Sequence, residues 1–148
     1  MSLIGITATR ALDDTGRSDI VALLSYLNPE EDAVIVGGCV GGDAFAGEVA
    51  KTLGLKVHVV LPEDDSQVDP IWVNYATTWE LGGPYRERNE RIVALADAVW
   101  AFPNHATQKE DPRSGTWMTI NIARRAKKLV YLKPQHARPV KPNAPTAA

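Results

Sequence analysis

The fold is decided by the stretch Ala-Val-Ile-Val-Gly-Gly-Cys-Val-Gly-Gly-Asp, residues 33–43. The apolar run at 33–36 is typical of a strand buried on both faces of a sheet. It ends at a pair of glycines, and Asp43 then opens a helical pattern that continues to Leu53, with Gly54 as its end signal. A buried strand that leads through a glycine turn into a helix predicts an α/β fold.

The same alternation extends over most of the chain. We predict further strands at residues 3–8, 57–61, 97–102 and 129–132. Further helices are predicted at residues 85–96 and 115–127. Another helix is expected before residue 33, with Ser18 as its N-cap, Leu27 on its inner face and Pro29 as its stop. Five strands with intervening helices predict a Rossmann-like three-layer sandwich around a mostly parallel sheet of order 3-2-1-4-5. Residues 62–84 lack strong periodicity, which indicates a functional connection or a small element without a clear signal.

Length and composition set the domain organisation. The chain has 148 residues, of which 45% are hydrophobic and 23% charged, a balance typical of one globular domain. We predict that this domain covers residues 1–133. The segment 134–148 contains four prolines and almost no large apolar residue, so we predict a disordered tail.

Several classes of protein are disfavoured by composition. A net charge of −2 gives no general positive field for nucleic acid. The one cysteine, Cys39, excludes an internal disulfide framework. No apolar run approaches the roughly 18 residues of a membrane span, and no secretory signal is evident, so we expect a cytoplasmic protein. His58, His105 and His136 are not spaced with acidic residues as metal ligands are, so no metal is predicted.

Two turns at the carboxyl edge of the predicted sheet are candidate anion sites. Glycines in the first turn let the backbone approach a ligand, and the free N–H groups of the next helix attract negative charge. Its candidate residues are Gly37, Gly38, Gly41, Gly42 and Asp43. The second turn, Ser114-Gly115-Thr116, opens another helix at the same edge. The alternatives are a tight turn with Asp43 as a cap, and simple capping by Ser114 or Thr116.

Basic side chains near this edge can meet an anion. Helical spacing places Arg88 and Asn89 partly on the inner side of their helix, where an arginine needs a partner such as a phosphate. Arg86 and Arg91 are expected on the solvated face. Arg10 follows Thr9 at the end of the first strand, and pairing with a neighbouring aspartate is the alternative.

Three further features remain open. Pro103 ends the fourth predicted strand at the same edge. The aromatic residues of the long connection, Trp72, Tyr75 and Trp79, can stack on a base or form a small core of their own. Cys39 is a conceivable nucleophile, but without a visible activating partner it fits a small buried thiol better.

The motifs Ile-Thr-Ala-Thr-Arg, Gly-Gly-Cys-Val-Gly-Gly-Asp-Ala-Phe-Ala, Tyr-Arg-Glu-Arg-Asn, Ala-Asp-Ala-Val-Trp-Ala-Phe and Ser-Gly-Thr-Trp occur in this order. In this set the chain resembles the SMF/DprA–LOG (SLOG) superfamily of Rossmann-like nucleotide-binding proteins, in particular its small YspA-like branch. The resemblance spans about residues 3–132. It implies that a nucleotide or nucleotide-derived ligand binds at the carboxyl edge of the sheet, without a cofactor.

The resemblance also implies roles for individual residues. Arg10 matches the basic residue after the first strand, and Arg88-Asn89 matches the Arg-Asn or Arg-Lys pair. In the LOG enzymes, which hydrolyse the N-glycosidic bond of nucleoside monophosphates, the pattern Gly-Gly-x-Gly-Thr-x-x-Glu supplies a catalytic glutamate. Here Thr119 stands at that glutamate position, and residues 111–113 replace the preceding glycines.

Three functions follow as hypotheses. The first is a binding module for a nucleotide or nucleotide-derived ligand, favoured because the catalytic glutamate is missing. The second is a nucleoside 5′-monophosphate phosphoribohydrolase or an N-deoxyribosyltransferase-like enzyme, with Arg88 and Glu87 as candidate catalytic residues and Glu80 as another source of the carboxylate. The third is single-stranded DNA binding, which the acidic composition disfavours. Family resemblance further implies a homodimer.

Overall fold

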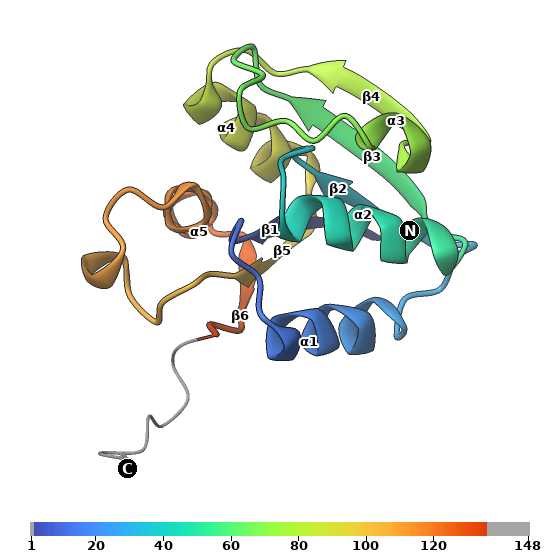
Figure 1. The fold of residues 1–148 in the computed structure, drawn as a ribbon, viewed down its shortest axis with the longest axis horizontal. Coiled ribbons are helices and arrows are strands. Elements are labelled where there is room, and N and C mark those ends of the chain that lie inside the picture. The colour runs from blue at the N-terminus through green and yellow to red at the C-terminus, as the bar shows by residue number, and fades with distance from the viewer. Residues whose placement is uncertain (1, 136–148) are drawn as a thin grey trace.

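A computed structural model describes residues 2–135, which form a six-stranded sheet. The sheet lies between two layers of helices (Figure 1). All the strand pairings are parallel, in the order β4-β3-β2-β1-β5-β6. The strands are β1 (Ser2–Ala8), β2 (Asp32–Val36), β3 (Lys56–Leu61), β4 (Thr78–Leu81), β5 (Ala98–Phe102) and β6 (Leu129–Leu132). The order predicted for five of these strands is confirmed, and β4 is an addition at one edge.

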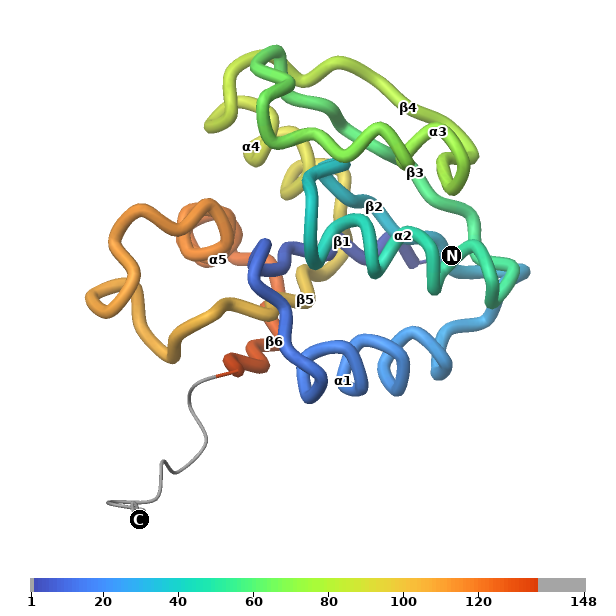
Figure 2. Tube along the Cα trace, viewed as in Figure 1, coloured from blue at the N-terminus to red at the C-terminus, as the bar shows by residue number. Residues whose placement is uncertain are grey.

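The helices cover both faces of this sheet (Figures 1 and 2). They are α1 (Asp14–Leu24), α2 (Gly42–Thr52), α3 (Trp72–Tyr75), α4 (Tyr85–Leu95) and α5 (Gly115–Arg125), with a 3-10 turn, η1 (Gln108–Glu110), before α5. Buried residues of α1, α2 and α3 share one hydrophobic cluster, and those of α4 and α5 pack on the other face. The expected three-layer sandwich is therefore confirmed.

Alternation along the central strand β1 explains this division. Ile4 and Ile6 point into the cluster under α1 and α2. Gly5 points to the opposite face, where a Cβ would lie only 3.2 Å from the Cβ of Ala96. A glycine at this position lets the end of α4 lie directly on the sheet.

The boundaries of α1 differ from the prediction. Its N-cap is Asp13, whose Oδ1 accepts the amide of Gly16 at 2.7 Å, whereas Ser18 lies exposed within the helix. Aspartate with an extended backbone satisfies a free helical N–H group as serine would, and it lies where the chain leaves the sheet. The helix ends at Leu24, before Leu27 and Pro29.

The connection at 62–84 contains two elements that the sequence did not reveal. One is the single-turn helix α3, and the other is the edge strand β4, which pairs with β3. Trp72 and Trp79 lie with their ring centroids 5.4 Å apart, and Tyr75 is buried against Gly47. These aromatic residues form local packing, which was the alternative to stacking on a base.

Only the first two residues of the predicted tail, Pro134 and Gln135, are described; residues 136–148, including His136, lie outside the described residues. Gln135 is buried, with 3% of its surface exposed. Within residues 2–135 no helix is long and apolar enough to cross a membrane.

Candidate ligand-binding cleft

A cleft of about 570 Å³ lies at the carboxyl ends of the central strands. Its walls come from the ends of β1 and β2, the loop before α5 and the first turns of α4 and α5. The chain continues from β1 to β2 on one side and returns through β5 on the other, so the cleft lies where the strand order reverses. In parallel α/β sheets this is the usual place for a ligand.

Most of the residues predicted from the sequence line this cleft. They are Thr9, Arg10, Gly37, Asp43, Arg88, Asn89, Ser114, Gly115 and Thr116. Five others, Gly38, Gly41, Gly42, Glu87 and Pro103, are not among its lining residues. The lining also includes residues that the sequence did not single out, notably Ser66, Gln67, Tyr85 and Met118. Ser66 and Gln67 belong to a connection without a motif, so no local signal indicated them.

The glycine turn between β2 and α2 packs against the protein's own backbone. Gly41 has a φ of +82°, and a Cβ there would lie within 2.5 Å of the Cα of Arg10. The amide of Gly42 donates to the carbonyl of Thr9 at 2.9 Å, so it is already used. These two glycines therefore bring the turn against the end of β1. The expectation that they cradle a ligand does not fit this geometry.

Arg88 lies on the inner side of α4 and is buried, with 5% of its surface exposed. Its Nη1 donates to the carbonyls of Gly37 at 2.6 Å and Val60 at 3.3 Å, and its Nε donates to Asn89 Oδ1 at 2.8 Å. Its Nη2 lies 3.7 Å from the sulfur of Cys39. Because a thiol is a weak acceptor, Nη2 is the part of the guanidinium that can still bind an anion.

Asp43 is the buried carboxyl group of the cleft. A Cβ on Gly37 would lie 2.5 Å from Arg88 Nη1 and 2.9 Å from Asp43 Oδ2, so these two side chains flank one point above Gly37. Burial raises the pKa of Asp43 to about 6, although the charge of Arg88 and the backbone amides of Cys39 and Gly37 oppose that rise. Asp43 can therefore gain or lose a proton close to neutral pH.

The first turn of α5 presents backbone donors to the cleft. Ser114 Oγ accepts the amide of Trp117 at 3.1 Å, so Ser114 caps the helix, which was the alternative considered for this serine. The amides of Gly115 and Thr116 have no partner among the hydrogen bonds of residues 2–135. No atom would lie within 4 Å of a Cβ on Gly115, so the space in front of this turn is open. An open helix N-terminus with free amides favours an anion.

Cys39 and Tyr85 also line the cleft near Arg88. Burial and then the charge of Asp43 raise the pKa of the Cys39 thiol, which disfavours the thiolate that a nucleophile requires. The ring of Tyr85 lies 5.4 Å from Arg88 Cζ, in a cation–π contact. Cys39 is half-buried in the cleft wall, and its raised pKa fits the interpretation as a small structural thiol better than that as a nucleophile.

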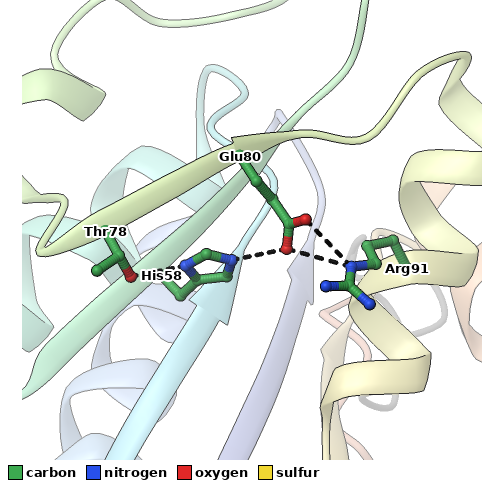
Figure 3. Close-up of polar contacts among 4 residues, drawn as sticks. All are labelled: His58, Thr78, Glu80 and Arg91. Atoms are coloured by element: carbon green, nitrogen blue, oxygen red, sulfur yellow. Dashed lines mark hydrogen bonds and ion pairs between the residues drawn. The ribbon is translucent and has the colours of Figure 1, made fainter.

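A second groove, of about 400 Å³, lies beside α4 against β3 and β4. Four of its polar side chains bind one another (Figure 3). His58 Nδ1 lies 2.7 Å from Thr78 Oγ1 and its Nε2 lies 2.9 Å from Glu80 Oε1, while Arg91 Nε reaches both oxygens of Glu80 at 3.2 Å. The hydrogen bond from His58 and the nearby Arg91 lower the pKa of Glu80. Glu80 is thus held in this groove and does not line the cleft.

Among residues 2–135, no group of three or more His, Cys, Asp or Glu side chains could hold a metal ion.

The fold and the cleft define the class of this protein as a Rossmann-like α/β domain with a candidate ligand site at its strand switch point. No protein-family model matches the sequence, and no curated protein matches it. Solved structures do match. DNA processing protein A from Helicobacter pylori, in a study of its single-stranded DNA binding mode, has a TM-score of 0.69 and 18% identity over 99% of this chain and 72% of that one.

Two other structures show the same fold. DNA processing protein A (DprA) from Streptococcus pneumoniae has a TM-score of 0.69 and 18% identity, over 93% of this chain and 52% of its own length. TM1055 has a TM-score of 0.65 and 18% identity, over 88% of this chain and 72% of its own. The chain therefore has the DprA-like Rossmann fold that the SLOG resemblance implied. At this identity the likeness concerns the fold alone.

Proposed function

We propose that the cleft binds a nucleotide or a nucleotide-derived ligand. The observation that carries this proposal is the open first turn of α5 at the switch point: Gly115 and Thr116 line the cleft, and their amides have no hydrogen-bond partner in the part of the chain that the structure describes. Arg10 and Arg113 are exposed residues of the same lining and add positive charge. A phosphate group is the ligand that this combination of amides and arginines suits best.

Other residues of the cleft lining suit the rest of a nucleotide. Arg88, Asn89 and Asp43 are buried polar side chains that can hydrogen-bond sugar hydroxyls or ring nitrogens. Tyr85 offers an aromatic surface beside them. A cleft that combines backbone amides and arginines with buried polar and aromatic side chains suits both the phosphate and the nucleoside of a nucleoside 5′-phosphate.

Binding without turnover is the function that the geometry supports best. Thr119, at the position where the LOG pattern has its glutamate, donates its hydroxyl to the carbonyl of Gly115 at 3.0 Å and carries no carboxylate. Glu87 is exposed on α4, outside the lining of the cleft. Neither residue can stabilise the positive charge that develops on a sugar when an N-glycosidic bond breaks.

One observation favours a second candidate function. Asp43 is a carboxyl group in the cleft with a pKa of about 6, beside Arg88. Such a group can accept a proton from a water that attacks the sugar C1′ and pass it to the departing base as the glycosidic C–N bond breaks. This function predicts release of free base and ribose 5-phosphate from a nucleoside 5′-monophosphate.

Calorimetric titration with nucleoside 5′-monophosphates, and with the matching nucleosides, tests the first function. We expect binding of at least one monophosphate and binding weaker by tenfold or more for its nucleoside, because the phosphate carries the charge-assisted contacts. Equal affinity for both would contradict a phosphate site at α5. Chromatography of the same mixtures for free base decides between binding and hydrolysis, with Asp43→Asn as the control for turnover.

Binding of single-stranded DNA is tested alongside binding of the nucleotides. The Helicobacter pylori protein of the same fold binds it, but this chain has 16 Lys and Arg against 18 Asp and Glu. We therefore expect little gel-shift binding of oligonucleotides. Tight binding that weakens steeply with salt would replace the small-ligand proposal.

A further inference from the structure

Gln135, near the end of the described chain, hydrogen-bonds the loop between β1 and α1 through its side chain. Its Oε1 accepts the amide of Asp13 at 2.5 Å, and its Nε2 donates to the carbonyl of Ala11 at 3.2 Å. Nε2 also lies 3.3 Å from Asn104 Oδ1 in the loop after β5. One buried amide therefore joins two loops at the carboxyl edge of the sheet.

Gly16 makes room for this contact. A Cβ at Gly16 would collide with the Oε1 of Gln135 and would lie 2.7 Å from Leu12 Cδ1. A glycine within a helix is unfavourable by about 1 kcal/mol relative to alanine. The position of Gln135 supplies a structural reason for that glycine.

The opposite side of the loop is held by the glycine turn. The amide of Gly42 donates to Thr9, and Gly41 lies directly against the backbone of Arg10. The loop of residues 9–13, which carries Arg10, is thus fixed between the glycine turn and Gln135. Arg10 itself is exposed, and no hydrogen bond or ion pair of its side chain is found within residues 2–135, so its backbone determines where it can point.

We propose that Gln135 is a positioning residue for the cleft: its amide fixes the loop of residues 9–13 and thereby holds Arg10 at the cleft. Its effect on ligand affinity rests on the proposed function, whereas its hold on the loop does not. A residue 125 positions after Arg10 then contributes to binding without touching the ligand.

A double-mutant cycle tests the link to Arg10, with adenosine 5′-monophosphate as the calorimetric probe. We expect Gln135→Ala and Arg10→Ala each to lower affinity several-fold, and the double variant to be no weaker than Arg10→Ala alone. If the affinity losses of the two single variants multiplied in the double variant, the proposal would be overturned, because Gln135 would then act independently of Arg10. A purely structural role would lower the melting temperature without this coupling.

Gly16→Ala reaches the same contact from the other side. Alanine normally stabilises a helix, so this variant is expected to fold while its methyl group displaces the Gln135 amide. Its affinity should fall as in Gln135→Ala. Ser18→Ala, on the exposed face of the same helix, is the matched control and should bind the probe as the wild type does; unchanged affinity in Gly16→Ala would count against the proposal.

Hydrogen exchange, measured without ligand, separates the hold of Gln135 on the loop from its effect on ligand affinity. We expect the Asp13 amide to exchange at least tenfold faster in Gln135→Ala, with the amides of β1 unchanged. Unchanged exchange at Asp13 would overturn the proposal. If the wild type bound no nucleoside 5′-monophosphate, the proposed function would lose its support, and exchange at Asp13 would still decide whether Gln135 holds the loop.

Discussion

Arg88 and Arg91 lie one helical turn apart on α4, yet they serve different regions of the molecule. Arg88 points inward, is 5% exposed and shares the cleft with the buried carboxyl of Asp43. Arg91 points to the second groove, where about half of its side chain is exposed and Glu80 accepts its Nε through both oxygens. One arginine is buried beside a titratable group, and the other is part of a satisfied surface network.

The difference shows which charges are available for function. In the groove, His58 and Arg91 both bind Glu80, so its carboxylate is fully engaged (Figure 3). In the cleft, Asp43 has a raised pKa, and the first turn of α5 has two amides without a partner among the described residues. Buried groups with perturbed pKa values beside free donors are typical of binding and catalytic sites. Exposed pairs of the kind in the groove contribute little even to stability.

The largest expected effect comes from Arg88→Ala. It removes the donor to two buried carbonyls and the positive charge beside Asp43, so we expect about 3 kcal/mol or more of lost stability. Nucleotide affinity should fall about tenfold or more where the variant remains folded. Chemical denaturation and calorimetry measure the two effects. An unchanged titration isotherm would refute the role of Arg88 in binding.

The second-largest expected effect comes from Gly41→Ala. The methyl group would meet the backbone of Arg10, and the positive φ at this position strains any residue with a side chain. We expect a loss of about 1–3 kcal/mol in stability and weaker nucleotide binding, because the loop that carries Arg10 must move. Gly54→Ala is the matched control: it has the same φ but lies far from the cleft, and its Cβ would only approach Pro29 at 3.8 Å. Equal affinity for the two variants would contradict this role.

Asp43 predicts a specific dependence on pH. Because its pKa rises from 3.8 to about 6 on folding, the unfolded chain ionises first as the pH increases. Its contribution to the free energy of unfolding is therefore fully present below about pH 4 and is lost as the pH rises to about 6, by on the order of 3 kcal/mol. Subtracting the profile of Asp43→Asn isolates this contribution. A flat difference between pH 4 and 6 would contradict the raised pKa.

The smallest effect is expected in the groove. Arg91→Ala should change the free energy of unfolding by about 0.2–1 kcal/mol and leave nucleotide affinity unchanged. This variant is the natural control for Arg88→Ala, since it removes the same side chain from the same helix. A loss of affinity comparable to that of Arg88→Ala would remove the distinction between the two regions.

The sequence predicted the central strands from their short apolar runs, and it predicted their order from the rules for right-handed crossovers in parallel sheets. It did not predict β4, since two of the four residues of Thr-Trp-Glu-Leu are polar, whereas β6, which is equally short and lies at the other edge, is the apolar run Leu-Val-Tyr-Leu. It predicted that Arg88 points inward from helical spacing alone, and the burial of Arg88 confirms this.

The role of the glycine turn and that of Gln135 could not be predicted. Glycines indicate a close approach of backbone, but not whether the approaching group is a ligand or, as for Gly41, the protein's own loop. Gln135 meets Asp13 across 122 positions of the chain, and no local pattern encodes such a contact.

The most direct test of the central claim is an NMR titration of the labelled protein with adenosine 5′-monophosphate, observing the backbone amides of Gly115 and Thr116. We predict that these two amides and the Arg88 side chain shift together along one binding curve, while the His58 and Arg91 signals stay in place. Shifts confined to the groove, or none at α5, would contradict a phosphate site in the cleft.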